Sequence, residues 1–430
     1  MNNQYSTYNQ FLSRLNSLGL FHMDMTLART ASAITPLAKA LQALPVLHVV
    51  GTNGKGSTSV FLEAIARAHS LKTGLFTSPH FLDPRERLRI NGRMLSEDEW
   101  IELANATADF PGCGQLTYFE LLTLIALTAF VQHKVDVAII EAGLGGTWDA
   151  TCILDPELAV LTPVGMDHEK ILGSTLEAIA QDKAGVLRGK PAISAAQTDE
   201  VRAVFTRTAK RTRTRLFWAQ DFYRVQKDAL FFQYKKDELH IPVASLGLRG
   251  AFQAHNAGLG LGAWHLFCEQ QKILWSAASC MRGLQSAFHP GRFQCAGTNP
   301  LFILDGAHNV MGLQTLVKEL EHQGIKPDTV IFSCMADKDV PALLHLIRQL
   351  NCTIIVPQIQ DNPRAACPNT LVAELDNKAT AAADMHQALH LIPQNADIVL
   401  VCGSLYLLAD FYALFPHFLN EPGAQKEIIS

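Results

Sequence analysis

The stretch that decides the fold is residues 46–58, which read Val-Leu-His-Val-Val-Gly-Thr-Asn-Gly-Lys-Gly-Ser-Thr. An apolar run over residues 46–50 leads into a glycine-rich turn, and a helical pattern follows from about Gly56 to His69. In a strand, loop and helix arranged in this order, the loop N–H groups and the positive end of the helix dipole face one small volume. The stretch therefore predicts a phosphate-binding loop.

The residue types of this turn fit that role. Gly51, Gly54 and Gly56 let the backbone curl closely around a phosphate, where a Cβ would clash. Lys55 adds a positive charge for the outer phosphates, and Ser57 or Thr58 offers a hydroxyl to Mg²⁺. The common P-loop has Ser or Thr directly after its lysine, whereas Gly56 intervenes here. This departure narrows the kinds of nucleotide enzyme to which the chain can belong.

Length and composition bound the class of protein. At 430 residues the chain is too long for one typical core, so two domains are expected. With 48% hydrophobic residues, 18% charged residues and a net charge of −4, we expect a soluble protein with neither nucleic acid nor a membrane as partner. Nine cysteines without a Cys-x-x-Cys pair, and a polar N-terminus, favour a reducing, cytoplasmic location. A monomer is the default expectation.

Strand and helix patterns alternate in the first part of the chain, which is typical of a parallel α/β sheet. The strands are expected at residues 47–50, 73–76, 135–141 and 158–162, and the helices at 56–69, 96–109, 117–133 and 175–187. The strands are continuous apolar runs, as expected where helices cover both faces of a sheet. Hairpin-like pieces at residues 229–234 and 238–243 precede a helix over 252–267.

A second α/β series begins near residue 290. Its strands are expected at residues 301–304, 329–333, 353–356 and 398–402, with helices at 312–322, 340–350 and 380–391. The pattern predicts a P-loop ATP-binding and substrate domain over residues 1–290 and a C-terminal Rossmann-like domain over 291–430. The fold class is therefore α/β, with a mostly parallel sheet in the P-loop domain and a second, smaller α/β domain.

Three polar residues lie at or near the ends of predicted elements of the first domain. Glu141 ends a buried strand, where parallel sheets bind ligands, and is a candidate Mg²⁺ ligand. Taken alone it would be a capping acid, but the P-loop and the glycine turn after it reverse that preference. His168 is usually a hydrogen-bonded polar residue in such a place, and here it is a candidate second metal ligand. Lys183 is a solvated surface lysine by default, yet in a low-dielectric site its amine becomes nucleophilic and can take up CO₂ as a carbamate.

The second domain contributes further loops, His289-Pro-Gly-Arg-Phe293, Asp305-Gly-Ala-His-Asn309 and Ala336-Asp-Lys-Asp339. Asp305 ends an apolar strand before a small-residue turn, which is again a ligand-facing location. Arg292 beside a glycine can act as an electrostatic clamp on phosphate. Each loop alone would be unremarkable, but two such sheets predict a ligand held between the domains.

Together these motifs resemble the folylpolyglutamate synthase/dihydrofolate synthase family of Mur-type amide ligases, from about Leu18 to Leu408. The turn Gly51-Thr52-Asn53-Gly54-Lys55-Gly56-Ser57 is similar to the family's P-loop, glycine after the lysine included. Thr77-Ser78-Pro79-His80 with Glu86-Arg87 resembles its second loop, which implies that Ser78 helps to hold Mg²⁺. Gly403-Ser-Leu-Tyr406 is a further signature of the family.

The resemblance also implies roles for single residues. Glu141 and His168 match the family's metal ligands, and Lys183 matches the lysine that is carbamylated in these ligases. Arg292, Asp305 and His308 match nucleotide-contacting positions, and Asn256 resembles the one near the adenine. Two residues depart from the family's pattern Gly-Leu-Gly-Gly-Arg-x-Asp-Ala-Thr-Asn, because Thr147 replaces the arginine and Cys152 the asparagine, while Asp149 and Thr151 are retained. The segment His22–Arg29 loosely matches bacterial members with both activities.

The activity implied by the resemblance is ATP-dependent ligation of L-glutamate to dihydropteroate, to the γ-carboxylate of a tetrahydrofolate, or to both, through an acyl phosphate. Lys55, Lys183 and His168 are the implied catalytic residues. One Mg²⁺ is expected at Ser57, Ser78 and Glu141, and a second at Glu141, His168 and carbamylated Lys183. Gly51, Thr52, Asn53, Gly54, Gly56 and Thr58 complete the expected ATP-binding set.

Two alternative functions compete with this interpretation. A Mur-type ligase acting on a cell-wall UDP-muramoyl precursor would share the P-loop, Glu141, His168 and Lys183. It would need an N-terminal domain of roughly a hundred residues, whereas about 45 residues precede the P-loop here. A non-catalytic P-loop switch protein would explain the first 60 residues but leave Lys183 and the second domain without a role.

Overall fold

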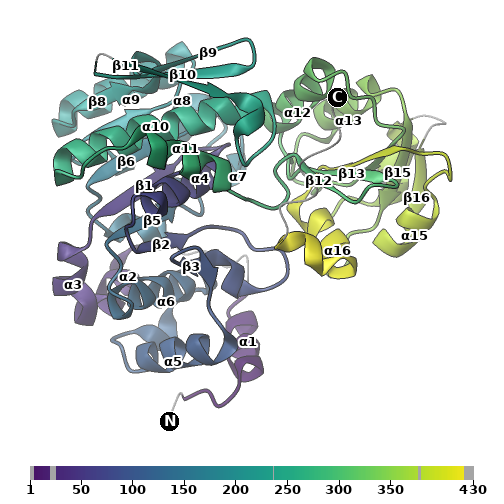
Figure 1. Ribbon diagram of the computed structural model, residues 1–430. Helices are drawn as coiled ribbons and strands as arrows, with labels where there is room; N and C mark the ends of the chain where they lie inside the picture. The colour runs from purple at the N-terminus through teal and green to yellow at the C-terminus, as the bar shows by residue number, and fades with distance from the viewer. Residues whose placement is uncertain (1–3, 20–25, 236, 376–378, 421–430) are drawn as a thin grey trace. The chain divides into compact units, whose positions relative to one another are not determined.

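The computed structural model describes residues 4–19, 26–235, 237–375 and 379–420 (Figure 1). The chain divides into two compact units, which are Met1–Pro242 with His255–Ala287, and Val243–Ala254 with Phe288–Ser430. The predicted α/β class, with a mostly parallel sheet followed by a smaller α/β part, is confirmed. The domain boundary at residue 290 stays a prediction. No helix among these residues is long and apolar enough to cross a bilayer.

An eight-stranded sheet forms the centre of the first unit, in the order β4-β3-β2-β5-β1-β6-β7-β8. The run from β2 to β8 is parallel, and only β3 and β4 pair antiparallel at one edge. The strands are β1 (Val46–Val50), β2 (Thr73–Phe76), β3 (Leu88–Ile90), β4 (Arg93–Met94), β5 (Val137–Glu141), β6 (Leu158–Leu161), β7 (Ala192–Ser194) and β8 (Leu216–Trp218). The carboxyl ends of β2, β5, β1 and β6 therefore meet at one edge, where a parallel sheet binds ligands.

Helices cover both faces of this sheet, as the continuous apolar strands predict. They are α1 (Tyr8–Ser17), α2 (Ala28–Ala33), α3 (Ala38–Ala43), α4 (Lys55–Ala68), α5 (Glu97–Ala108), α6 (Tyr118–Gln132), α7 (Glu169–Leu172), α8 (Leu176–Lys183), α9 (Asp199–Thr212), α10 (Ala251–Gln271) and α11 (Ala277–Ser286). Local chemistry sets several of their ends. Ser96 with Glu99 and Thr117 with Glu120 form capping boxes that begin α5 and α6.

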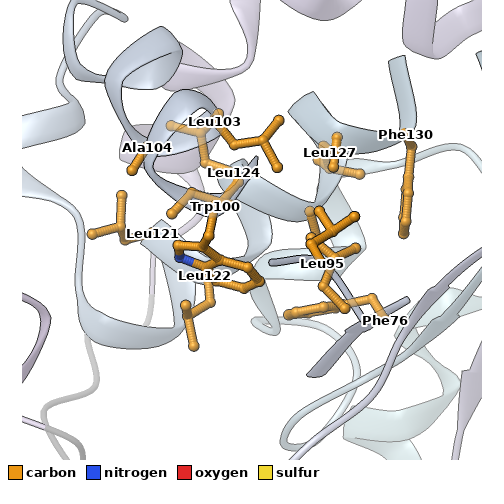
Figure 2. Close-up of a cluster of buried hydrophobic side chains, with 14 of the residues drawn as sticks. Phe76, Leu95, Trp100, Leu103, Ala104, Leu121, Leu122, Leu124, Leu127 and Phe130 are labelled. Atoms are coloured by element: carbon orange, nitrogen blue, oxygen red, sulfur yellow. The ribbon is translucent and has the colours of Figure 1, made fainter. Parts of the chain in front are cut away.

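One apolar cluster of the unit packs α1, α5 and α6 against the sheet. Trp100 of α5 lies among Leu95, Leu121 and Leu122, with Phe76 of β2 at the strand side of the cluster (Figure 2). A separate cluster packs α8 and α9 against β6 and β7. A three-stranded antiparallel sheet of β9 (Tyr223–Gln226), β10 (Ala229–Tyr234) and β11 (Asp237–Pro242) completes the predicted hairpin region.

The second unit contains a six-stranded sheet in the order β12-β13-β17-β14-β15-β16, parallel except for β12. Its strands are β12 (Gln294–Ala296), β13 (Leu301–Leu304), β14 (Thr329–Phe332), β15 (Thr353–Pro357), β16 (Ala379–Ala382) and β17 (Ile398–Cys402). Its helices are α12 (Val310–His322), α13 (Val340–Gln349), α14 (Pro368–Glu374), α15 (Met385–His390) and α16 (Leu405–Leu414). An apolar core lies between the sheet and helices α12, α13 and α14.

One predicted element is wrong in part. Residues 380–391 were expected to form one helix, but Ala379–Ala382 is strand β16 and only Met385–His390 is helical. Alanine favours a helix locally, yet β16 pairs along its whole length with β15 and so extends the sheet by one strand. Tertiary pairing outweighs the weak local preference here.

Trp100 provides a test of the first unit's core. It is 1% exposed, so Trp100→Ala should lower the free energy of unfolding by about 3–5 kcal/mol, because it removes a fully buried ring and leaves a cavity. Urea unfolding of the full chain measures the loss. Leu274→Ala is the control, since Leu274 is 87% exposed and its truncation should change that free energy by less than about 0.5 kcal/mol. Equal unfolding midpoints for the two variants would contradict the packing described.

Candidate nucleotide and metal site

The P-loop lies between β1 and α4, as predicted. Thr58 N–H donates the first helical hydrogen bond to Gly54 O at 2.9 Å, so the amides of Lys55, Gly56 and Ser57 point out of the helix end. Helix α4 is 14 residues long, and its dipole adds positive potential at the same place. The geometry is that of an anion-binding helix terminus.

Close approach explains two of the glycines. Gly54 has φ +84°, and a Cβ added there would lie 2.6 Å from Asn256 Oδ1. A Cβ at Gly51 would collide with Thr162 Oγ1. The structure thereby places Asn256, which sequence reasoning put near the adenine, directly against the P-loop. Its predicted contact with nucleotide stays a prediction.

The first half of the loop is tied to the turn after β6. Thr52 N–H and Asn53 N–H both donate to Pro163 O, at 3.0 and 3.3 Å. The Thr52 hydroxyl donates to Gly165 O and accepts from Gly165 N–H, each at 3.1 Å. These bonds fix the first half of the loop through the backbone of Thr52 and Asn53 and through the Thr52 hydroxyl.

Two lysines converge on this loop. Lys55 Nζ donates to Thr52 O at 3.2 Å, and Lys183 Nζ donates to Gly51 O at 2.7 Å. Lys183 is 4% exposed, and burial, with a contribution from the nearby Lys55 charge, lowers the pKa of Lys183 to about 7. A substantial neutral fraction of this amine therefore exists near neutral pH, which a surface lysine lacks.

The predicted metal ligands occupy adjacent strand ends. Ser78 follows β2 and Glu141 ends β5, and Ser78 N–H donates to Glu141 Oε2 at 3.0 Å. Both Glu141 and Ser57 are buried. His168 follows β6, where its backbone is left-handed at φ +53° and its N–H donates to Asp167 Oδ1 at 2.8 Å. Its imidazole is partly exposed, with Nε2 3.9 Å from Asp167 Oδ1.

Within the described part of the chain, no three His, Cys, Asp or Glu side chains gather as a ready metal-binding group. The predicted sites differ from such a group, because they combine Glu141 with serine hydroxyls, one imidazole and a modified lysine. The oxygen donors among these groups, completed by water and phosphate, suit Mg²⁺. The ligand assignments of Ser57, Ser78, Glu141, His168 and Lys183 stay predictions.

Sequence reasoning missed the role of Thr147, which replaces the arginine usual at this position. Its N–H and its hydroxyl both donate to Asp182 O, at 3.1 and 2.8 Å. Thr147 thus binds the last turn of α8, next to Lys183. The Asp182 carboxylate also accepts a hydrogen bond from Gly146 N–H. Burial raises the pKa of this carboxyl, and the hydrogen bond opposes that shift. No sequence signal distinguishes this use of a threonine from a surface one.

In the second unit, three predicted residues lie close to the carboxyl end of β13: Asp305 and His308 follow the strand, and Arg292 approaches Gly306 from the turn before β12. The buried Asp305 carboxylate accepts from Phe293 N–H and Ala307 N–H, each at 2.8 Å. Burial raises the pKa of Asp305, and the neighbouring Arg292 and His308 oppose that shift. Arg292 Nη1 donates to Gly291 O at 3.2 Å, and His308 Nδ1 lies 2.8 Å from Gly306 O. Arg292 also lines a small cavity of this unit together with Arg249 and His289.

Comparison with known proteins decides the family. The Mur ligase middle domain matches residues 49–264, and the Mur ligase glutamate ligase domain matches residues 291–405. The Dihydrofolate synthase/folylpolyglutamate synthase of Bacillus subtilis (strain 168) is 30% identical over 425 residues, covering 94% of this chain and 98% of its own. The chain belongs to the folylpolyglutamate synthase/dihydrofolate synthase family. It is an enzyme of the ligase class.

Solved structures of family members agree. The bifunctional enzyme of Yersinia pestis, complexed with AMPPNP and Mn ion, has a TM-score of 0.85 at 32% identity and covers 97% of this chain and 100% of its own. E. coli FolC in complex with DHPP and ADP has a TM-score of 0.83 at 30% identity and covers 96% and 98%. Neither the cell-wall precursor ligase nor the P-loop switch protein is favoured by these matches.

The N-terminal segment that favours both activities falls partly outside the described residues, which omit 20–25. Arg29 at its end is described, and its Nη2 lies 3.1 Å from Glu120 Oε1. The Thr30 hydroxyl donates to the same oxygen at 3.1 Å. Arg29 and Thr30 are thereby joined to Glu120 in the first turn of α6.

Gly54→Ala tests the geometry of the loop. The added Cβ would meet Asn256 in a backbone conformation that disfavours side chains, so ADP binding in the presence of Mg²⁺ should weaken by about tenfold or more. Gly112→Ala is a matched control, because Gly112 also has positive φ (+72°) but nothing lies within 4 Å of its Cβ position. Calorimetric titration gives both dissociation constants. An unchanged ADP dissociation constant for Gly54→Ala would show that the close approach of Asn256 to Gly54 does not matter for nucleotide binding.

Proposed function

We propose that this chain is an ATP-dependent ligase that joins L-glutamate to dihydropteroate, to the γ-carboxylate of a tetrahydrofolate, or to both. The observation that carries the proposal is the hydrogen bond from the buried Lys183 to Gly51 O, which joins the P-loop to the lysine that the family modifies. Further support comes from relatives named for both synthase activities and from their complexes with ADP, AMPPNP and Mn ion.

The reaction begins with activation of the acceptor carboxylate, because a free carboxylate is a poor electrophile. Its oxygen attacks the γ-phosphorus of ATP, the bond to the β–γ bridging oxygen breaks, and ADP leaves as an acyl phosphate forms. Such a transfer needs mainly positioning and neutralisation of charge. Lys55 and the amides of Lys55, Gly56 and Ser57 supply both at the β- and γ-phosphates.

The second step is amide formation. The glutamate nitrogen attacks the acyl carbon, a proton leaves the nitrogen, and inorganic phosphate departs with the electron pair of the C–O bond. Bound Mg²⁺ supplies neutralisation of negative charge in both steps. Ser57, Ser78 and Glu141 would hold one such ion, and Glu141, His168 and carbamylated Lys183 would hold a second. The hydroxyl oxygens of Ser57 and Ser78 and the buried Glu141 carboxylate match its preference for oxygen.

The remaining assignments belong to the same proposal. Asn256, Arg292, Asp305 and His308 contact the nucleotide, and residues 1–290 and 291–430 form the two domains. We further propose that the protein is a monomer and that it lies in the cytoplasm, and the nine free cysteines support the second of these proposals.

A paired assay tests the function. Purified enzyme is incubated with ATP, Mg²⁺ and labelled glutamate, with either dihydropteroate or tetrahydrofolate as acceptor. Labelled product and phosphate release should appear only when an acceptor and glutamate are both present.

In Lys55→Ala the rates of product formation and of phosphate release should each fall by about three orders of magnitude or more, because phosphoryl transfer loses its main cation. The control is Lys39→Ala, which removes an exposed lysine of α3 and should retain full activity. Ligation by Lys55→Ala at the control rate would refute the P-loop assignment.

Lys183→Ala tests the modified lysine. The variant should lose ligation and regain part of it with added acetate or propionate, since a short carboxylate can replace the carbamate oxygens. Lys170→Ala, on the neighbouring helix α7, should show neither loss nor rescue. Activity without any added acid, or loss that no short acid restores, would contradict the metal-ligand role of Lys183.

A further inference from the structure

A chain of buried hydrogen bonds lies beneath the glycine turn that follows Glu141. The Asp149 carboxylate accepts from Leu144 N–H at 2.8 Å and from Gly143 N–H, which fixes the first half of the turn. It also accepts from Thr151, through N–H at 2.9 Å and through the hydroxyl. Thr151 Oγ1 in turn lies 2.7 Å from His48 Nε2. All three side chains are buried.

The hydrogen atoms available to each group determine which group donates and which accepts in these hydrogen bonds. The Thr151 hydroxyl has a single hydrogen, which it donates to Asp149, so its lone pairs remain for His48. Burial, with a smaller effect of the Arg188 charge, lowers the pKa of His48 to about 3, and the imidazole is neutral. With the Thr151 hydroxyl donating to Asp149, we assign the one ring hydrogen of neutral His48 to Nε2, where it donates to Thr151 Oγ1. An apolar side chain at position 48 would leave a buried oxygen without this donor.

The turn held by Asp149 is packed on the end of α8. A Cβ at Gly146 would lie 2.7 Å from Lys183 Cα, and Thr147 donates twice to Asp182 O. Lys183 Nζ closes the path at Gly51 O, three residues after His48 in the sequence. Contacts thus run from β1 through Thr151, Asp149 and the turn to Lys183, and back to the loop that follows β1.

We propose that His48 is a positioning residue: through Thr151 and Asp149 it fixes the glycine turn, and with it Lys183, against the P-loop. His48 itself touches no reacting group. Its effect on turnover rests on the proposed function, whereas its effect on the turn does not. Arg188 provides a parallel link, because it donates to Gly185 O at 2.9 Å and to Cys152 O, but it does not contact Asp149 through any hydrogen bond among the described residues.

Two substitutions of the full-length enzyme separate positioning from general stability. His48→Leu removes the donor at similar volume, and His48→Gln restores an N–H donor. Amide hydrogen exchange of the free enzyme is followed in peptides covering residues 142–152, with peptides of β14 as internal reference. We expect exchange in the turn of His48→Leu to be about tenfold faster, with β14 unchanged and with most of the protection recovered in His48→Gln.

Turnover gives the second readout. His48→Leu should lower kcat about tenfold with the KM for ATP unchanged, and His48→Gln should recover most of kcat. If His48→Leu fails to fold, Thr151→Val breaks the same link and should produce both effects. Unchanged exchange in residues 142–152 of a folded His48→Leu or Thr151→Val protein overturns the proposal. So does a uniform rise in exchange over the whole first unit, which would show a purely structural role. If the wild type itself has no ligase activity, the proposed function fails while the exchange result still decides the role of His48.

Discussion

The hydrogen bond from Lys183 to Gly51 O is the constraint on which the first unit's site depends. It brings a lysine from the last turn of α8 to the loop between β1 and α4, although 132 residues separate the two. A lysine amine can lie in such a buried position only if the surroundings tolerate an amine that is shielded from water. The lowered pKa of Lys183, caused mainly by burial, is the consequence of that environment. The same proximity brings the Lys55 and Lys183 amines near one another beside the loop at which polyanionic phosphates are proposed to bind.

Parallel topology explains why the other groups gather there. Because β2, β5, β1 and β6 are neighbours with the same direction, the residues that follow them share one edge of the sheet. This arrangement accounts for the positions of Ser78 after β2, Glu141 at the end of β5, the P-loop after β1 and His168 after β6. The second unit repeats it after β13, where the Asp305 carboxylate is held by two backbone N–H groups.

Much of this was predictable from the sequence, for identifiable reasons. The run from Val46 to Thr58 combines apolar periodicity, glycine and lysine in one short segment, so strand, loop and helix could be placed together. Four strands of the first sheet, β1, β2, β5 and β6, were predicted because they are continuous and apolar, whereas the short strands β3, β4, β7 and β8 were missed. The chemistry of Thr147 and His48 was out of reach, because each acts through a partner distant in sequence, Asp182 and Thr151. Strand β16 was mistaken for part of a helix because its alanines carry a helical preference that pairing with β15 overrides.

The contact between Gly54 and Asn256 has a broader consequence. One wall of the phosphate loop is built by an amide that the ribosome adds some two hundred residues later, from helix α10. The segment from β1 to α4 could therefore not be transferred alone to another protein. On a different sheet it would keep its glycines but lose the Asn256 side chain that packs against Gly54. In related chains, substitutions at the positions of Gly54 and Asn256 should therefore occur together, so that a bulkier residue at one position is accompanied by a smaller residue at the other.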